Sequence, residues 1–223
     1  MKDILIYGIG GLGQIVVADM ERYKSANPVA FVADREYCNI ESLRGLPVVP
    51  LDEVVSKYPP ENYDMLVAFG MGRLRLRASL YQKAKDLGYT LANYISPGAF
   101  LDDRNYPMGD NNIILDGARI GFGGSLGSDN VIRQNVYVGH EFDIGNHNIL
   151  SVGTVVGGRC RFGDLNYVAL SVTIASNRVI GDECLIGMSS NVTKNIESYA
   201  KAYGNPAKVV SFHKDTGVDI GFE

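Results

Sequence analysis

An aliphatic residue or phenylalanine recurs at every sixth position between Ile114 and Val192 without interruption. A period of six fits neither an amphipathic helix, with a period of about 3.6, nor an alternating strand, with a period of about 2. It is typical of a parallel β-helix of hexapeptides, in which short strands coil into a prism and one aliphatic residue per hexapeptide points inward. Glycine often follows the aliphatic residue, and we interpret it as supplying the freedom of a tight corner. These glycines are residues 121, 127, 139, 145, 157, 163, 181 and 187.

The pattern before residue 98 is different, because apolar strands alternate there with helical stretches. Strands are expected at 3–7, 29–33, 65–69 and 92–95, with a short edge strand at 47–50. Helices are expected after the segment GIGGLG to about residue 24, and over about 73–87. Strand–helix alternation with short loops predicts a small parallel α/β sheet of the Rossmann-like kind.

Two domains follow from these two patterns. We predict an α/β domain over residues 1–97 and a β-helix domain with a C-terminal tail over 98–223, with an imperfect first coil at 99–113 and regular hexapeptides over 114–197. The tail beyond Val210 shows no strong period and receives no assignment.

Composition and charge narrow the function classes. Of the 223 residues 46% are hydrophobic and 21% charged, which is ordinary for a globular protein, and the net charge of −4 gives no reason to expect a nucleic-acid partner. No apolar run approaches the roughly 20 residues that span a bilayer. Three cysteines form no disulfide framework, which favours the cytoplasm, and Cys160 and Cys184 fall where small packing residues suit the repeat. The basic residues Arg73, Arg75 and Arg77 are interpreted as a solvated helix face, with phosphate contact as the alternative.

Gly8, Gly10 and Gly13 form a G-x-G-x-x-G pattern between the first strand and the first helix. Such glycines let the backbone approach a phosphate, and the start of the helix offers free N–H groups. Asp34, at the end of the second strand, could accept hydrogen bonds from a ribose or a base. This predicts nucleotide binding, and with fewer than 100 residues available a single mononucleotide half-site fits better than a dinucleotide redox domain. The alternative is a purely structural role, in which the glycines only allow tight packing of the strand on the helix.

His140 is the candidate catalytic residue. One turn of the prism is 18 residues, so Gly158 lies next to His140 in the following coil, which leaves an open notch for an extended ligand. Neutral imidazole is suited to removing a proton from an amine or hydroxyl nucleophile. Glu141 could fix the tautomer, but adjacent residues of a flat strand point to opposite faces, so the pairing requires a corner. A histidine that merely decorates the prism is the alternative.

Two other kinds of chemistry are disfavoured. His147 and His213 do not form a ligand set with His140, so no metal site is predicted, and His147 is interpreted as a surface or interface residue, with substrate contact left open. The serines of the repeat lie where small polar residues are normal, and the chain contains no G-x-S-x-G elbow.

Taken together, the glycine loop, Asp34, the hexapeptide prism, His140-Glu141 and the segment Gly204–Lys208 resemble a known family over about residues 2–210. The chain is similar to the sugar O- and N-acyltransferases of the PglD/NeuD type, which carry a left-handed β-helix. The resemblance implies acetyl-CoA as cosubstrate, a homotrimer formed through the prism, and active sites between neighbouring subunits.

The resemblance also assigns roles to individual residues. It implies a general base at His140 and its carboxylate partner at Glu141. The nucleotide-linked sugar is expected in the α/β domain, at Gly8, Gly10, Gly11, Gly13, Asp34, Arg35 and Gly70. CoA is expected along a groove between two prisms, at Gly158, Ala169, Asn205, Pro206, Ala207 and Lys208.

Three features of the chain bear on its place within that family. Relatives that bind UDP-sugars often carry histidine in the glycine loop where this chain has Leu12, which bears on the identity of the nucleotide. Ala169 replaces a frequent glycine and could alter how the pantetheine arm packs. The His-Glu pair, in contrast to His-Gly, leans toward the N-acetyltransferase branch.

We therefore expect an acetyl-CoA-dependent N-acetyltransferase that acts on the amino group of a nucleotide-linked amino-deoxy sugar in surface-polysaccharide synthesis. Three rival functions remain: a sugar O-acetyltransferase, a nucleotide-binding oxidoreductase, and a non-catalytic trimeric scaffold. The residues name neither the sugar nor its nucleotide nor the length of the acyl chain.

Overall fold

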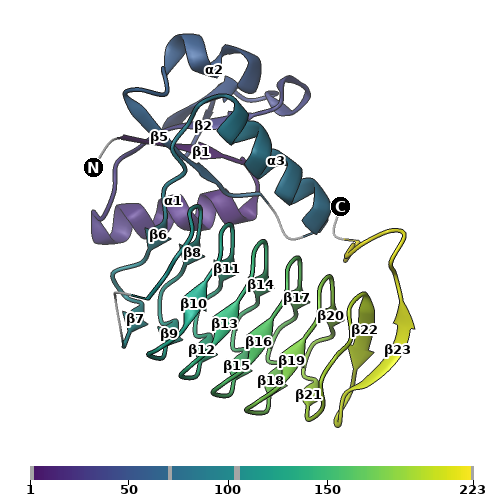
Figure 1. The fold of residues 1–223 in the computed structure, drawn as a ribbon. Helices are drawn as coiled ribbons and strands as arrows, with labels where there is room; N and C mark the ends of the chain where they lie inside the picture. Colours follow the sequence, from purple (N-terminus) through teal and green to yellow (C-terminus); the bar gives the residue numbers. More distant parts are fainter. Residues whose placement is uncertain (1–2, 70–71, 103–105, 222–223) are drawn as a thin grey trace.

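The computed structural model describes residues 3–69, 72–102 and 106–221. The chain forms a small α/β domain that sits on one side of a long prism of short parallel strands (Figure 1). None of the helices among the described residues is long and apolar enough to cross a membrane.

The α/β domain contains a sheet with strand order β3-β4-β2-β1-β5. Its parallel strands are β1 (Asp3–Tyr7), β2 (Pro28–Ala33), β4 (Leu46–Pro50) and β5 (Tyr63–Val67), as the apolar runs predicted. The helices are α1 (Gly11–Tyr23), α2 (Leu51–Lys57) and α3 (Leu74–Asp86). Neither α2 nor the short helix η1 (Arg35–Tyr37) was predicted from the sequence.

Two strand predictions need correction. The segment 47–50 is not the edge of the sheet, because the two-residue strand β3 (Ser42–Leu43) pairs with β4 on its outer side. The strand expected at 92–95 does not close the α/β sheet. It is β6 (Tyr94–Ile95), which pairs with β8 (Ile113–Ile114) and so begins the prism.

The prism has three faces, each a ladder of parallel two-residue strands one coil apart, and the first face ends in the longer strands β22 and β23, which pair antiparallel. The first face has the order β23-β22-β20-β17-β14-β11-β8-β6, the second β21-β18-β15-β12-β9-β7, and the third β10-β13-β16-β19. Their bounds are β7 (Phe100–Leu101), β9 (Arg119–Ile120), β10 (Ser125–Leu126), β11 (Val131–Ile132), β12 (Tyr137–Val138), β13 (Asp143–Ile144), β14 (Ile149–Leu150), β15 (Val155–Val156), β16 (Arg161–Phe162), β17 (Tyr167–Val168), β18 (Thr173–Ile174), β19 (Val179–Ile180), β20 (Leu185–Ile186), β21 (Asn191–Val192), β22 (Ala200–Tyr203) and β23 (Lys208–Phe212). The six-residue series lies inside, forming a continuous buried core with Cys160 and Cys184. The predicted left-handed β-helix is confirmed.

The corners of the prism are built differently from the prediction. A residue with positive φ recurs at every sixth position, but it stands three places after the aliphatic residue. These corner residues are Asn111, Gly117, Gly123, Asp129, Asn135, Glu141, His147, Gly153, Arg159, Leu165, Ser171, Asn177, Glu183 and Ser189. The glycines that directly follow the aliphatic residues serve another purpose, because a Cβ there would collide with the neighbouring coil. At Gly139, for example, it would lie 2.5 Å from the backbone nitrogen of Gly158.

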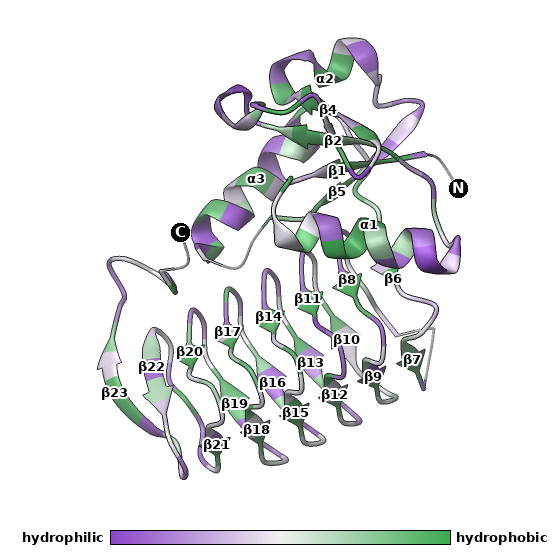
Figure 2. Ribbon diagram, turned by 180° about the vertical axis from the view of Figure 1, so that it is seen from behind, coloured by the Kyte–Doolittle hydropathy of each residue, from purple (hydrophilic) through white to green (hydrophobic). Residues whose placement is uncertain are grey.

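The first face carries the α/β domain because its outward positions are apolar. Ile113, Val131, Ile149, Tyr167 and Leu185 are all buried, and they form one hydrophobic cluster with residues of helix α1. The outward positions of the other two faces are mixed in polarity, as the hydropathy colouring of Figure 2 shows.

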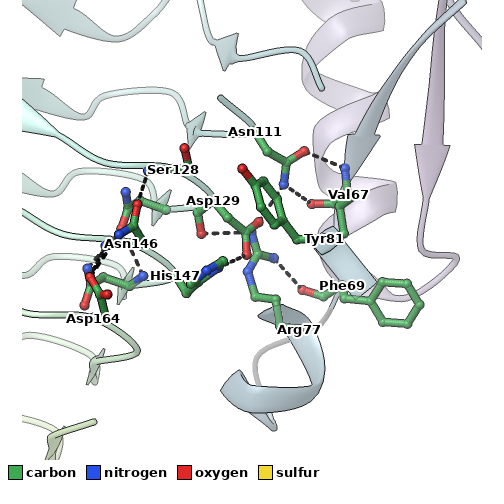
Figure 3. A network of polar contacts seen from close by, with 12 residues as sticks. Val67, Phe69, Arg77, Tyr81, Asn111, Ser128, Asp129, Asn146, His147 and Asp164 are labelled. Atoms are coloured by element: carbon green, nitrogen blue, oxygen red, sulfur yellow. Dashed lines mark hydrogen bonds and ion pairs between the residues drawn. The ribbon is translucent and has the colours of Figure 1, made fainter. Parts of the chain in front are cut away.

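One column of corners, at the junction of the third and first faces, carries the polar contacts with the α/β domain (Figure 3). Asp129 accepts a hydrogen bond from the buried Arg77 at 2.5 Å, and His147 Nδ1 lies 2.8 Å from the other oxygen of Asp129. Asn111, one coil earlier, pairs with both backbone groups of Val67. The interpretation of Arg77 as a solvated residue was therefore wrong, since its side chain is fully buried and ion-paired.

The C-terminal tail returns to the α/β domain. Val218 is buried, and the backbone around it pairs with Gly72–Leu74 at the start of helix α3 through an antiparallel bridge between Arg73 and Asp219. Arg75 fastens the tail further, because its guanidinium binds both carboxylate oxygens of Glu183 and the backbone oxygen of Lys214. The tail beyond Val210, which had no predicted role, thus connects the two domains.

Candidate active site

The glycine loop lies between β1 and the first turn of α1. Gly8 has φ +131°, and a Cβ there would lie 2.6 Å from the backbone oxygen of Ala68, so only glycine fits. Gly13 packs just as tightly against the backbone oxygen of Gly8. At Gly10 and Gly11, in contrast, a Cβ would meet nothing within 4 Å. Two of the four glycines therefore let the strand and helix approach each other, and the other two keep the start of the helix open.

A cavity of about 300 Å³ opens at this loop, and Gly8, Gly10, Asp34 and Phe69 are among the residues that line it. The helix begins with no side-chain cap, so its first N–H groups remain available to an anion. Burial, together with the charge of Asp34, raises the pKa of Tyr7, whose hydroxyl donates to Asp34 at 3.3 Å. The other oxygen of Asp34 accepts from Lys83 at 2.8 Å.

Two further residues, Arg35 and Gly70, were predicted for this site. Arg35 is not among the residues that line the cavity, because its guanidinium is bound to Asp52 at 2.7 Å and to Glu53 at 2.7 Å. Gly70 lies outside the described residues.

His140 and Glu141 lie at a corner between the second and third faces, between β12 and β13. The left-handed backbone of Glu141 (φ 54°) turns its side chain back, so its Oε2 lies 2.9 Å from His140 Nδ1. The corner that this pairing required is therefore present. Arg159 donates to the same carboxylate oxygen at 2.9 Å from one coil further on. The pKa of Glu141 is lowered first by its hydrogen bond with His140 and then by its hydrogen bond with Arg159, so the carboxylate stays ionised.

The imidazole lies over Gly158, as the period of 18 predicted. A Cβ at Gly158 would come within 2.7 Å of His140 Nε2, so only glycine leaves this side of the ring open. The exposed ring of Phe122 is stacked on His140, with centroids 5.5 Å apart and an interplanar angle of 15°. With Nδ1 bound to Glu141, Nε2 is the nitrogen that can exchange a proton with a ligand over Gly158.

The residues predicted to bind CoA do not all lie together. Ala169 follows β17, at the corner between the first and second faces, whereas Gly158 follows β15, at the corner between the second and third faces. The whole second face separates the two corners. Ser176 lies one coil beyond Gly158. The two coils are in close contact there, because a Cβ at the neighbouring Gly157 would lie 2.5 Å from the backbone nitrogen of Ser176. From the sequence, Ser176 was considered only among the serines of the repeat, although adding 18 to 158 places it next to Gly158.

The turn Gly204–Lys208 joins β22 to β23 at the C-terminal end of the prism, and the Asn205–Pro206 peptide bond is cis. It is anchored on the second face, where the backbone nitrogen of Ala207 donates to Asn191 at 2.8 Å. Asn205 and Pro206 are exposed, as a ligand contact requires.

The other histidines have structural partners. His147 packs edge-on against Tyr81 and pairs with Asp129, so it belongs to the domain junction. His213 Nε2 lies 2.6 Å from the backbone oxygen of Glu183, within the tail contacts. Across the described residues, histidine, cysteine and acidic side chains do not gather in any group of three or more that could hold a metal ion.

Comparisons with known proteins agree with this architecture. Residues 3–84 match the PglD N-terminal domain family. A point mutant of perosamine N-acetyltransferase from Caulobacter crescentus, solved with CoA and GDP-perosamine, superimposes with a TM-score of 0.85 at 23% identity, over 95% of this chain and 98% of the other. The acetyltransferase domain of PglB from Neisseria gonorrhoeae, solved with acetyl coenzyme A, gives 0.85 at 22% identity, over 94% and 99%.

A third solved structure, WeeI from Acinetobacter baumannii, gives a TM-score of 0.80 at 20% identity, over 94% of this chain and 100% of the other. A search of curated proteins found no match. The chain shares its whole two-domain fold with these proteins, and residues 3–84 of its α/β part match the model of the PglD N-terminal domain.

Proposed function

We propose that this protein is an acetyl-CoA-dependent N-acetyltransferase that acts on the amino group of a nucleotide-linked amino-deoxy sugar, in the synthesis of a surface polysaccharide or related glycan. The proposal rests mainly on one observation: His140 is held by Glu141 at a corner of the prism, with Nε2 open over Gly158. The solved relatives with CoA, and in one case GDP-perosamine, support the choice of substrates.

The chemistry assigned to this corner is acyl transfer. The amine of the sugar attacks the thioester carbonyl of acetyl-CoA, the C–N bond forms, and the C–S bond breaks to release the thiol of CoA. His140 Nε2 accepts the proton that the amine loses and returns it to the sulfur of the leaving CoA, and the ionised Glu141 stabilises the imidazolium in between through Nδ1. Backbone N–H groups of the adjoining coils, near Gly158 and Ser176, are the candidate donors to the developing oxyanion.

The nucleotide is assigned to the glycine-loop cavity, with Gly10, Gly11 and the helix start facing its phosphates and Asp34 its ribose or base. CoA is assigned to the groove that passes Gly158 and Ser176 toward the turn at Asn205–Lys208. Because Ala169 lies at another corner, it can contact the same ligands only from a second copy of the chain. This supports a homotrimer with active sites between subunits.

The test is to incubate the purified protein with acetyl-CoA and a panel of UDP-, GDP- and dTDP-linked amino sugars while free thiol is measured. Thiol release that depends on the sugar supports transfer, and its absence with every sugar contradicts the proposal. The product shows whether an amine or a hydroxyl group of the sugar was acetylated, because an N-acetyl amide withstands hydroxylamine whereas an O-acetyl ester is cleaved. A parallel incubation with NADH tests the redox alternative.

A further inference from the structure

Three successive coils of the prism meet around His140. Phe122 lies one coil before His140 and Gly158 one coil after it, each two places beyond a strand of the second face. Backbone hydrogen bonds join the coils at this corner. The nitrogen of Glu141 donates to the oxygen of Phe122 at 2.8 Å, and the nitrogen of Arg159 donates to the oxygen of His140 at 2.8 Å. The side chains of the three coils are therefore held at a fixed spacing.

The phenyl ring of Phe122 lies flat against the imidazole of His140. The two rings are stacked at 15° with centroids 5.5 Å apart, within the usual range of an offset aromatic pair. Phe122 is 55% exposed and does not belong to the buried core of the prism, so core packing does not account for it. Its ring closes the side of the imidazole that faces the preceding coil, whereas Gly158 leaves the other side open.

Arg159 holds the carboxylate of Glu141 from the following coil. Its Nε donates to Glu141 Oε2 at 2.9 Å, and the same oxygen lies 2.9 Å from His140 Nδ1. The three side chains are all partly exposed, so each would sample several rotamers without these partners. Arg159 thus favours the one orientation of Glu141 in which the carboxylate binds the imidazole.

Resting on the proposed function, we propose that Phe122 and Arg159 are positioning residues for the acetyl transfer. Phe122 acts on the ring of His140, and Arg159 acts on the carboxylate of Glu141, so that Nε2 stays in place to receive the proton of the amine. A base is effective only within hydrogen-bond reach of the proton that it removes. Loss of either side chain should therefore lower kcat and leave the KM values for both substrates unchanged.

Arg159→Ala tests the contact with the carboxylate. We expect kcat to fall roughly two- to fivefold, the fold-change that corresponds to an exposed ion pair. Arg161→Ala is the matched control, because Arg161 pairs in the same way with Asp143 of the preceding coil and is also exposed. Its kcat should equal that of the wild type. In Glu141→Ala, further replacement of Arg159 should cost nothing, because the carboxylate that it holds is already absent.

Two results would overturn the role of Arg159. An equal loss of kcat in the wild-type and Glu141→Ala backgrounds would show that Arg159 acts independently of the carboxylate. A raised KM for acetyl-CoA or for the sugar would make Arg159 a ligand contact.

Phe122→Ala tests the contact with the ring. We expect kcat to fall roughly two- to tenfold, the fold-change that corresponds to an aromatic pair, and Phe122→Tyr should restore it because the ring is kept. Phe100→Ala is the matched control, since Phe100 is 56% exposed and packs against Arg119. All these variants should keep the wild-type melting temperature. A Phe122→Tyr variant as slow as Phe122→Ala, or a loss of kcat that follows a fall in melting temperature, would overturn the role of Phe122.

A measurement that needs no acyl transfer separates this inference from the proposed function. Diethyl pyrocarbonate modifies neutral imidazole, and mass spectrometry follows the modification at His140. Phe122→Ala should react faster at His140 than either the wild type or Phe100→Ala, because the ring is then open on both sides. An unchanged rate would show that Phe122 does not hold the ring. Faster modification in a protein that transfers no acetyl group would support the contact and contradict only the proposed function.

Discussion

Arg77 and Asp129 form an ion pair in which both side chains are fully buried, one on helix α3 and the other at a corner of the prism. The Asp129 carboxylate also accepts from Asn111 at 2.6 Å and pairs with His147. The guanidinium of Arg77 donates to Phe69, a residue of the glycine-loop cavity, at 3.1 Å. The ion pair thus fixes the glycine-loop cavity relative to the coils of the prism.

Removal of one partner of this pair should destabilise the folded protein. Asp129→Ala leaves the charge of Arg77 buried without its counter-ion, and we expect the free energy of unfolding to fall by about 3–5 kcal/mol, measured by urea denaturation. The matched control is Asp52→Ala, which breaks the exposed ion pair with Arg35 and should cost no more than about 1 kcal/mol. Equal losses in the two variants would show that the buried pair does not hold the domains together.

Replacement of the base should reduce turnover without unfolding the prism. His140 faces the open notch above Gly158, so His140→Ala should keep the wild-type melting temperature and the affinity for CoA. We expect kcat to fall by roughly 10²–10⁴, and toward the lower end for an amine, which attacks before it loses its proton. Steady-state kinetics with isothermal titration of CoA provides the measurement. Near-wild-type turnover with CoA still bound would leave proximity as the source of catalysis.

Glu141 predicts a specific pH dependence of turnover. Its lowered pKa, caused first by the hydrogen bond with His140 and then by Arg159, means that it stays an anion through the neutral and mildly acidic range. The carboxylate therefore holds the imidazole in place at pH values where an ordinary glutamate has begun to take up a proton, and the ratio of wild-type to Glu141→Gln kcat should stay constant across that range. The maximal kcat should fall less than in His140→Ala, because only orientation and charge stabilisation are lost. A ratio that falls toward one in the mildly acidic range would contradict the pairing of the two residues.

Much of this architecture was predictable, because a strict period constrains both the core and the stacking. Adding 18 to a residue number predicts its neighbour in the next coil, and this placed His140 over Gly158 correctly. The same rule would have revealed the buried ladder Asn112, Asn130, Asn148 and Asn166, in which each side chain bonds the next coil. This ladder was not predicted, because the period was followed only through the apolar positions.

Other features depend on contacts between domains, which no local pattern records. Arg77 follows Arg73 and Arg75 in the sequence, a series that is typical of a solvated helix face. Only the prism packed against helix α3 buries Arg77. The tail had no period because Val218–Ile220 pairs with Gly72–Leu74, far away in the sequence. The role given to the repeat glycines was wrong for a related reason. A short backbone contact between coils and a left-handed corner both favour glycine, and the sequence alone does not separate them.

Two glycines of the loop should respond differently to substitution. Gly10 has φ −72° and open space at its Cβ position, so Gly10→Val should fold normally while its side chain blocks the approach of a phosphate. Binding of the nucleotide-linked sugar should weaken, with CoA affinity unchanged, as measured by titration calorimetry. Gly13→Ala should instead destabilise the fold, since its Cβ collides with the backbone oxygen of Gly8. Equal weakening of both ligands in Gly10→Val would refute the division into two binding sites.

Assembly provides the last prediction, because His140 lies at the corner between the second and third faces, whereas the glycine loop belongs to the α/β domain over the first face. Light scattering should give a mass near three times 24.3 kDa. Each variant alone, His140→Ala or Gly10→Val, should have low transferase activity when the sugar concentration is kept well below the KM of Gly10→Val. When the two are co-expressed with different tags and purified as mixed trimers, activity should return, since about one site in three then pairs an intact His140 with an intact glycine loop of the neighbouring copy. Mixed assemblies no more active than the separate variants would place both residues in the same site of one chain, and a clean monomer with full activity would exclude the shared site altogether.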